Sequence, residues 1–487
     1  MGVFPPQYGD IGVGVSVSSS PAALNSLSRR PHSGAAGLST VGGLAYAGFV
    51  LSVVLVSLVF GGGTRQGLWS DALVQIVSLP LLAVSILRLK ALASPSEFRL
   101  ALLLIGAVIV VPVLQLVPLP PWIWTILPGR AEVAEAYTAA GIPLPFLPIS
   151  LEPLTTLRSL LSLLPAIAVF LGVLSLREEV EFRWVLLLIF AVAVVGAGLE
   201  LLQLAGGVHS PLRFYEITNV HRGVGFFANS NHQAAFLYGT IGYAAIWASL
   251  ARRDRSGKFA FHLAVAAILF VAIVIGLVAT QSRFGVLLGL AAGFCSIPLV
   301  AGLTSEAKRG RIVKLAVVVN GLALLLAFLF GFAGFADRMS AALSSDLRWP
   351  VARITWKAAM DHFPFGSGIG TFAPIYQRYE PVHYLAETYV NRAHNDWLEA
   401  WLEGGIASAA VICALLSCYA FLAYRSWRPA DPNARLVAYA RAGSICVALL
   451  VVHSLLDYPL RTTALTVMLA ISCAFMIRAY LDVPRHV

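Results

Sequence analysis

Charged residues are scarce in this chain. Only 12% of its 487 residues carry a charged side chain, whereas 58% are hydrophobic. A soluble globular protein has roughly 25% charged residues, so an ordinary soluble enzyme is excluded. Several apolar runs reach about 20 residues, the length at which a helix crosses a bilayer, and they lack the short alternation of an outer-membrane barrel. The predicted fold class is an all-α polytopic membrane protein.

Cysteine is also rare. The chain has five cysteines, all within predicted spans and none in a polar loop: Cys295, Cys413, Cys418, Cys446 and Cys473. Cysteines in such places are small buried hydrophobic residues, and the pattern speaks against a disulfide framework or a cysteine-based metal site.

We expect no cleavable signal peptide from the N-terminal sequence. Residues 1–38 are rich in Gly, Ser and Pro, and the first apolar run begins only near Thr40. This composition predicts a disordered tail. The chain also lacks an internal repeat of the kind that many transporters contain.

The apolar runs predict twelve spans. They cover residues 40–60, 68–87, 100–118, 157–176, 184–204, 232–250, 260–280, 285–303, 315–335, 398–422, 442–457 and 462–481. The chain is thereby divided into a tail (1–38), a bundle of spans one to nine (39–335), a long loop (336–397) and a bundle of spans ten to twelve (398–487).

Basic residues set the predicted orientation. The net charge is +10, but the charges lie in short loops between spans, which excludes a nucleic-acid partner. The loops at residues 252–255 and 308–311 are strongly basic, and short basic loops stay in the cytoplasm. Both termini are predicted on that side. The long loops at residues 119–156, 205–231 and 336–397 then face the opposite side.

A first polar motif precedes the sixth span. It begins at Arg222 and reaches Asn229 and Asn231 in the sequence Arg-Gly-Val-Gly-Phe-Phe-Ala-Asn-Ser-Asn-His. A cation with two amides could bind an anionic head group. The alternative is a helix-capping turn, because Asn and Ser are good caps.

A second polar motif is the tight turn Thr-Gln-Ser-Arg between the seventh and eighth spans, which ends at Arg283. A lone arginine between apolar helices could extend to the membrane surface. So short a turn nevertheless holds Arg283 close to the bundle, which favours anion binding.

A third motif lies in the long loop. Arg348 and Arg353 precede a glycine-rich stretch that contains Gly366, Gly368 and Gly370. No βαβ unit surrounds these glycines, so a dinucleotide-binding turn is excluded and a tight turn is predicted. Arg353 is a candidate phosphate ligand.

The fourth motif, His394 followed by Asn395 and Asp396, lies directly before the tenth span. A polar cluster beside a membrane helix is a functional-site hypothesis by default. Histidine is mostly neutral near pH 7, so His394 is a candidate general base. The alternatives are a structural histidine at a helix start and a metal site, but no second His or Cys lies at ligand spacing. Helical spacing puts Asp396, Glu399 and Glu403 on one face.

A smaller motif between the last two spans runs from His453 through Asp457 to Arg461. Arg461 could add positive charge to the site or anchor the chain at the interface.

Together these motifs resemble those of the O-antigen ligase and polymerase superfamily of bacterial inner membranes. The family signature is a histidine, then Asn, Ser or Gln, nine residues, and Gly-x-x-Gly. Here it reads His394, Asn395, nine residues and Gly405, with Ser408 in place of the second glycine. The other three motifs also match the family's and occur in the same order, within residues 220–462.

The resemblance implies a metal-independent glycosyltransferase without a cofactor, whose active site faces the periplasm. The donor would be a glycan on undecaprenyl diphosphate. The acceptor would be a second lipid-linked repeat unit or lipid A–core, and a chain-length regulator could be a further partner.

An inverting mechanism follows. His394 would accept a proton from the acceptor hydroxyl, while Arg222 and Arg283 stabilise the leaving diphosphate. The predicted substrate-binding residues are Arg353, Asn229, Asn231, Asn395, Asp396 and Arg461.

A twelve-span transporter is the rival class. Its charged residues should lie near the membrane midplane, whereas these motifs gather in loops on one side. Within the family we expect a polymerase of O-antigen or exopolysaccharide. An O-antigen ligase and a protein O-oligosaccharyltransferase are the alternatives.

Overall fold

The structure, a computed structural model, describes residues 33–301 and 348–482, except residues 66, 93 and 178 and the segments 251–258, 386–388 and 429–434. Residues 310, 314 and 321 are also described. The chain divides into two units after Tyr46. The described part of the first unit is the beginning of α1, and all that follows concerns the second unit, Ala47–Val487.

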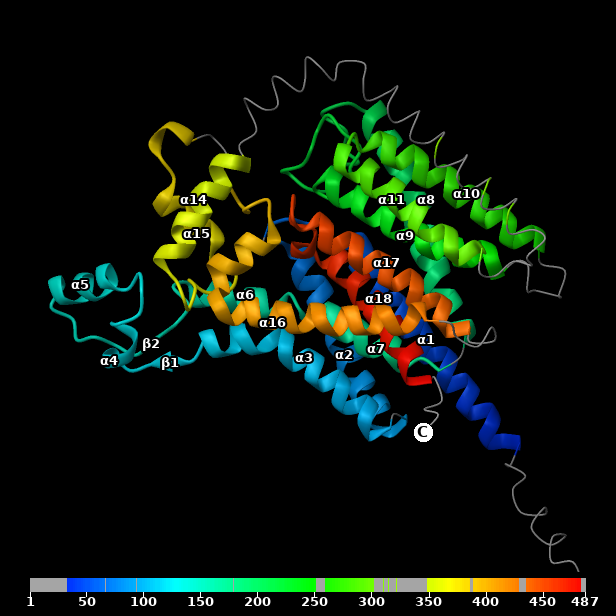
Figure 1. The fold of residues 1–487 in the computed structure, drawn as a ribbon, viewed down its shortest axis with the longest axis horizontal. Helices are drawn as coiled ribbons and strands as arrows, with labels where there is room; N and C mark the ends of the chain where they lie inside the picture. The colour runs from blue at the N-terminus through cyan, green and yellow to red at the C-terminus, as the bar shows by residue number, and fades with distance from the viewer. Residues whose placement is uncertain are drawn as a thin grey trace, which may run out of the picture. The chain divides into compact units, whose positions relative to one another are not determined.

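Helices make up almost all of the described structure (Figure 1). The long helices are α1 (Ser33–Phe60), α2 (Trp69–Leu92), α3 (Pro95–Gln115), α8 (Glu179–Ala205), α9 (Ser230–Leu250), α10 (Phe259–Ala279), α11 (Arg283–Ala301), α16 (Asp396–Trp427), α17 (Arg435–His453) and α18 (Thr463–Asp482). The shorter ones are α4 (Pro121–Trp124), α5 (Ala131–Ala139), α6 (Pro153–Leu161), α7 (Leu164–Leu174), α14 (Arg348–Asp361), α15 (Phe372–Tyr379), η2 (Val382–Tyr384) and η3 (Pro459–Arg461). The strands of the described residues are β1 (Pro118–Leu119) and β2 (Leu147–Pro148), which pair antiparallel, Pro118 with Pro148.

Eight candidate membrane spans occur among the described residues. Two more apolar stretches, Ala264–Ala279 in α10 and Arg283–Leu299 in α11, are shorter. Helix α9 lies where the sixth span is predicted, and the predicted ninth span, 315–335, lies outside the described residues apart from residue 321. A mostly helical, multi-pass membrane protein is therefore confirmed, whereas the count of twelve spans is not.

The predicted fourth span consists of two helices. Helix α6 ends at Leu161 and α7 begins at Leu164. Pro165 stands in the first turn of α7, where its missing N–H costs no helix hydrogen bond. Because α2 and α18 both pack against α7, its residues from Ala168 to Leu174 are buried.

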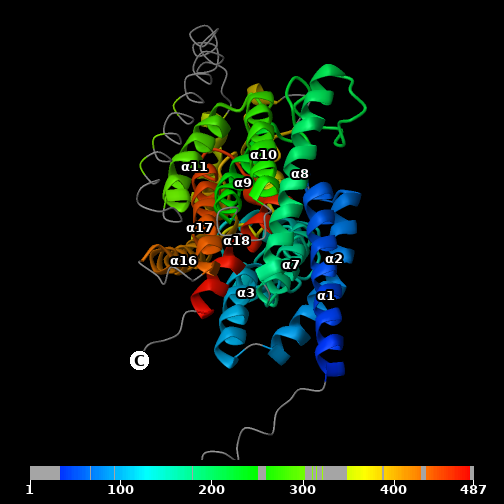
Figure 2. The same ribbon diagram turned by 90° about the vertical axis from the view of Figure 1, so that its right-hand side faces the viewer.

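Helices α9, α17 and α18 form the centre of the second unit, with α16 towards one edge and α2 towards the other (Figure 2). The ring of Phe475 on α18 packs against Phe182 of α8, Tyr243 of α9 and Tyr439 of α17, with centroids 5.4–5.9 Å apart. These buried rings fix the helices whose ends carry the polar residues described below.

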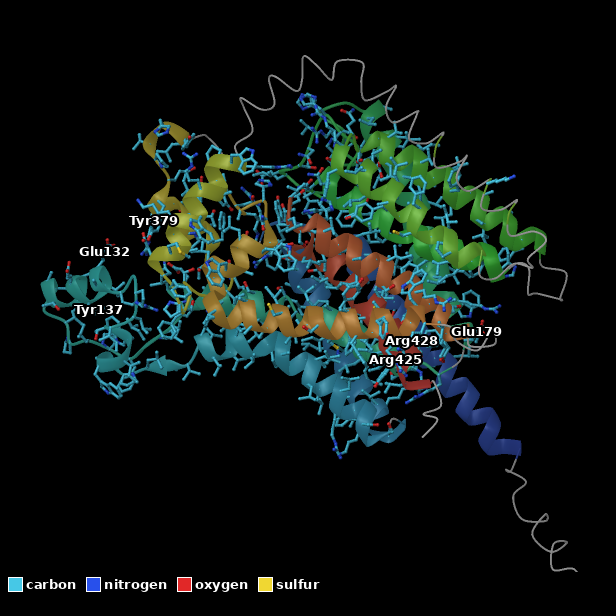
Figure 3. The ribbon with its side chains drawn as sticks, viewed as in Figure 1. Glu132, Tyr137, Glu179, Tyr379, Arg425 and Arg428 are labelled. Atoms are coloured by element: carbon cyan, nitrogen blue, oxygen red, sulfur yellow. The ribbon has the colours of Figure 1, made fainter. Side chains whose placement is uncertain are left out.

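The described part of the long loop folds onto the beginning of α16. A buried cluster joins α14, α15 and α16 through Val351, Ala358, Phe372, Tyr376 and Leu402. Figure 3 shows Tyr379 of α15, with Glu132 and Tyr137 of α5, at one end of the bundle, whereas Glu179, Arg425 and Arg428 lie towards the other.

Candidate active site

His394 lies in a short turn whose neighbours are fixed. Its φ is +53°, a left-handed conformation that costs a non-glycine residue about 1–3 kcal/mol. The N–H of Ala393 donates to Glu399 at 2.9 Å, and the N–H of Asp396 donates to the carbonyl of Ser454 at 2.9 Å. These bonds hold the backbone on both sides, while the side chain of His394 remains 32% exposed. The imidazole is therefore both positioned and accessible.

Asp457 pairs with His394. Its Oδ1 lies 3.5 Å from Nδ1 of His394, and Asn231 donates to its Oδ2 at 2.6 Å. Burial raises the pKa of Asp457, but the contact with His394 and the charges of the nearby imidazoles outweigh burial, so the pKa lies below its ordinary value. The ionised carboxylate can orient the imidazole of His394 and stabilise it once it is protonated.

Two further imidazoles lie near Asp457. Nε2 of His453 is 4.0 Å from Oδ2 of Asp457. The ring of Tyr458 packs edge-on against both His232 and His394, with centroids 4.9 and 5.1 Å apart. His232 and His453 are fully buried. Within the described ranges, no three His, Cys, Asp or Glu side chains are grouped so that they could hold a metal ion.

A buried charge cluster lies at the beginning of α16. Arg461 lies 3.4 Å from Asp396, 3.4 Å from Glu399 and 3.1 Å from Glu403, and Arg392 pairs with Glu399 at 2.9 Å. The predicted shared face of the three acids is confirmed. Burial lowers the pKa of Arg461, but the three carboxylates outweigh burial and raise it. The charged groups of Arg461 and Asp396 are thus engaged within the protein.

Helix α16 is kinked at Gly405, the glycine of the histidine motif. Gly405 has φ +55° and ψ −143°, and a Cβ there would lie 2.0 Å from the carbonyl oxygen of Pro364. Two helix carbonyls before the kink accept hydrogen bonds from the N–H groups of Ser367 (3.0 Å) and Gly368 (2.9 Å). The glycine-rich turn is thereby attached to the helix that follows His394.

Arg222 and Arg283 come together although they belong to different loops. The N–H of Gly223 donates to the carbonyl of Ala279 at 2.9 Å, which joins the first polar motif to the end of α10. Partial burial and the charges of Arg283 and Arg348 lower the pKa of Arg222. We call Arg222, Arg283 and Arg348 the arginine cluster. Like charges repel, and an anion among them would relieve the repulsion.

The arginine cluster adjoins the histidine site. Phe284, next to Arg283, packs its ring against His453 at 5.3 Å, and Arg348 interacts electrostatically with His453. The third motif thus contributes Arg348, which sequence reasoning did not choose. Arg353 is exposed, and no hydrogen bond or ion pair between described residues involves it.

The three asparagines of the predicted site differ in their contacts. Oδ1 of Asn229 accepts the N–H of Asn231 at 2.8 Å, and Oδ1 of Asn395 accepts the N–H of Leu398 at 3.0 Å. These two side chains cap α9 and α16, as the alternative interpretation held for Asn229. Asn231 instead reaches Asp457.

Sequence reasoning missed Asp457 as a partner of His394. The residue stands in the last polar motif, which was noted only for Arg461. The available signal was an acidic side chain in a polar turn between two spans, since ionisable groups at membrane helices commonly have a partner.

The fold and the site define a multi-pass membrane protein with an imidazole, a carboxylate and several arginines at one end. Residues 267–413 match the model of the O-antigen ligase family, and this match supports a relationship to the O-antigen ligase and polymerase superfamily. The match contains Arg283, Arg353 and His394, and the family's members are glycosyltransferase-type enzymes. A comparison with curated proteins gives no match.

Proposed function

We propose that this protein is a metal-independent glycosyltransferase of the bacterial inner membrane, with its site on the periplasmic face. Its donor would be a glycan on undecaprenyl diphosphate. The observation that carries the proposal is the contact of His394 with the ionised Asp457 beside the arginine cluster.

The reaction is an inverting transfer. His394 takes the proton of the acceptor hydroxyl, and the hydroxyl oxygen attacks the anomeric carbon of the donor. The new C–O bond forms as the bond from that carbon to the diphosphate oxygen breaks. The lipid diphosphate leaves with the bonding electron pair, and the proton passes from His394 to solvent. A positioned general base contributes about 10²–10⁴-fold to such a rate.

The remaining residues bind or position. The arginine cluster would stabilise the charge that develops on the leaving diphosphate, because planar guanidinium groups suit phosphate oxygens. The exposed Arg353 is a further candidate phosphate ligand. Asp457, held by Asn231, positions His394. We assign Asp396 and Arg461 to positioning, because their charged groups pair with each other. Asn229 and Asn395 cap their helices, and Nδ2 of Asn395 also donates to the carbonyl of Leu455 at 2.9 Å, so we assign both asparagines to holding the loops of the site in place.

An apolar cavity of about 360 Å³ beside the site suits a lipid chain. Residues of α3, α7, α16, α17 and α18 form its walls, and Asp396, Trp397 and Ser454 are among the residues that line it. A lipid-linked substrate could place its hydrocarbon there and its head group near His394.

Polymerisation of lipid-linked repeat units is the reaction that we propose, as in ligase-like polymerases with an extended loop. The test uses the protein in nanodiscs with a defined lipid diphosphate–linked repeat unit, with and without lipid A–core. A product ladder from the donor alone supports a polymerase. A single shifted band that needs lipid A–core indicates a ligase instead, and no product in either reaction contradicts both.

A further inference from the structure

A second cavity, of about 520 Å³, lies between the α1–α2 connection and the loop that precedes α9. Sites for small ligands are commonly about 300–1,000 Å³. Thr64, Arg65, Trp69, Phe214 and Glu216 are among its lining residues. None of them belongs to the site described above.

This cavity adjoins the candidate active site. Ala228 lines it and directly precedes Asn229, and the N–H of Ala228 donates to the carbonyl of Gly62 at 3.0 Å. The guanidinium of Arg65 lies over the ring of Tyr389 at 5.4 Å from its centroid. Tyr389 is part of the segment that leads to His394. The cavity therefore borders both loops that carry the reacting groups.

The wall of the cavity that the loop before α9 forms is held by hydrogen bonds. Arg213 donates to the carbonyl oxygens of Val220 (2.6 Å) and Arg222 (3.0 Å), which closes the loop between them. The hydroxyl of Tyr215 donates to the carbonyl of Phe60 at 3.2 Å. The same loop thus presents one side to the cavity and carries Arg222 at its end.

The residues that line this cavity include exposed aromatic rings and two side chains of opposite charge. Trp69 is 92% exposed and Phe214 is 57% exposed. Arg65 and Glu216 carry opposite charges, and neither forms an ion pair with another described residue. A diphosphate would require several cations, as at the arginine cluster, and a hydrocarbon chain would require none of these polar groups. Sugar rings offer both apolar C–H faces and many hydroxyls, which matches this lining.

We infer that this cavity is a saccharide-binding subsite, which holds sugar residues of one of the two glycan substrates next to His394. Its role in transfer rests on the proposed function, whereas its binding of sugar does not. Glu216 and Arg65 would bind hydroxyls, and Trp69 would cover a sugar ring.

The binding test uses tail-free glycan, released by mild acid from the polysaccharide of the source strain. Its affinity is measured by saturation-transfer NMR with the His394→Ala protein in nanodiscs, so that turnover cannot interfere. Arg65→Ala should weaken binding roughly tenfold, the size of effect expected for a lost charged hydrogen bond. Trp69→Ala should weaken binding by a similar factor, because it removes the aromatic face on which a sugar ring would lie. Trp69→Phe keeps an aromatic face and should bind nearly as the parent does. Trp122→Ala, at an exposed tryptophan of α4 outside this lining, is the matched control.

Kinetics identify which glycan occupies the subsite. Tail-free glycan lacks the leaving group and can only accept, whereas a lipid-linked unit with its acceptor hydroxyl blocked can only donate. Arg65→Ala should raise KM for one of the two with little change in kcat, and that one is the occupant.

The inference is overturned if tail-free glycan does not bind, or binds equally well to the parent protein and to both alanine variants. It is also overturned if Arg65→Ala loses only a co-purified phospholipid, because the cavity would then hold a lipid head group. Binding without any transfer by the wild-type protein would contradict the proposed function and leave the subsite standing. Transfer by the wild-type protein, with binding and KM unchanged in both variants, would overturn the subsite and leave the proposed function standing.

Discussion

His394 has a strained, fixed backbone and an accessible side chain. Its accessible side chain distinguishes His394 from His232 and His453, whose imidazoles are buried. The two buried imidazoles cannot reach a substrate, although they surround the same carboxylate. Strain at a residue with φ of +53° persists only where its surroundings enforce it. Here the bonds of Ala393 and Asp396 enforce it, and the imidazole is directed to Asp457.

Replacement of His394 by alanine should abolish transfer and leave membrane insertion intact. The loss of a general base lowers kcat by about 10²–10⁴-fold. The rate of product formation in nanodiscs is the measurement. His383→Ala, at an exposed histidine of η2, is the control and should react like the wild type. Normal turnover by the His394→Ala protein would exclude the residue as the base.

Replacement of Asp457 by asparagine keeps the side-chain shape and removes the charge. We expect kcat to fall by roughly 10²-fold or more with a smaller change in KM, because the protonated imidazole loses its counter-charge. The folded-state pKa of Asp457 lies below its unfolded value of about 3.9. The carboxylate therefore stabilises the fold above that pH, and the stabilisation disappears as the pH falls below it. A wild-type melting temperature that drops towards pH 3 no faster than that of Asp457→Asn would contradict this assignment.

At the scale of elements, the kink in α16 determines how the glycine-rich turn meets the site. The turn donates its N–H groups to helix carbonyls, and Gln115 of α3 reinforces the junction, since it donates to the carbonyl of Glu403 at 2.9 Å and accepts the N–H of Ile369 at 2.8 Å. Two separate segments, the glycine-rich turn and α3, therefore hold the beginning of the helix after His394. Gly405, the glycine of the histidine motif, allows this close contact, because a Cβ there would lie 2.0 Å from the carbonyl oxygen of Pro364.

Gly405→Ala should destabilise the protein. A Cβ would lie 2.0 Å from the carbonyl oxygen of Pro364, and the backbone there has φ +55°; strain of this kind costs on the order of 1–3 kcal/mol. The melting temperature in detergent should fall and activity with it. Gly106→Ala in α3 is the matched control, because no atom lies within 4 Å of a Cβ built there. Equal melting temperatures for the two variants would refute the structural role of the kink.

Helix α14 carries basic residues in distinct surroundings. Arg348 interacts with Arg222 and His453, whereas the ammonium of Lys357 lies over the ring of Tyr379 at 6.0 Å. Arg348→Ala should lower kcat/KM for the lipid diphosphate donor by about tenfold or more, the effect of removing one group that stabilises developing charge. Lys357→Ala on the same helix should leave it unchanged. A wild-type kcat/KM for Arg348→Ala would remove this arginine from the proposed site.

At the scale of the whole molecule, the two ends of the second unit differ. The histidine site, the arginine cluster and the cavity lined by Arg65 and Trp69 border the loops at one end, and the basic residues Arg425 and Arg428 of α16 lie towards the other (Figure 3). Polar groups concentrated at one end favour chemistry at a membrane surface over transport through the midplane.

Cysteine labelling tests the orientation. In a variant without the five native cysteines, Glu132→Cys should react with a membrane-impermeant maleimide added to intact spheroplasts. Arg428→Cys should react only after the membrane is opened. Labelling of Arg428→Cys in intact spheroplasts would reverse the predicted topology.

The sequence by itself determined the class of fold and the candidate motifs. Apolar runs long enough to cross a bilayer are a local property, and so are the Asn caps and the shared face of Asp396, Glu399 and Glu403. His394, Arg222 and Arg283 could be selected because a polar residue beside a membrane helix costs free energy and is therefore expected to have a function.

Only the tertiary structure decided which polar residues meet. Asn231 contacts Asp457 across 226 residues of chain, Arg348 rather than Arg353 approaches Arg222 and His453, and Arg461 is enclosed by carboxylates. Membrane helices offer little in sequence that specifies their neighbours, because lipid is as apolar as their side chains and packing alone selects the partners. The pairing of His394 with Asp457, and the cavity lined by Arg65 and Trp69, therefore became visible only when helix packing had brought distant loops together.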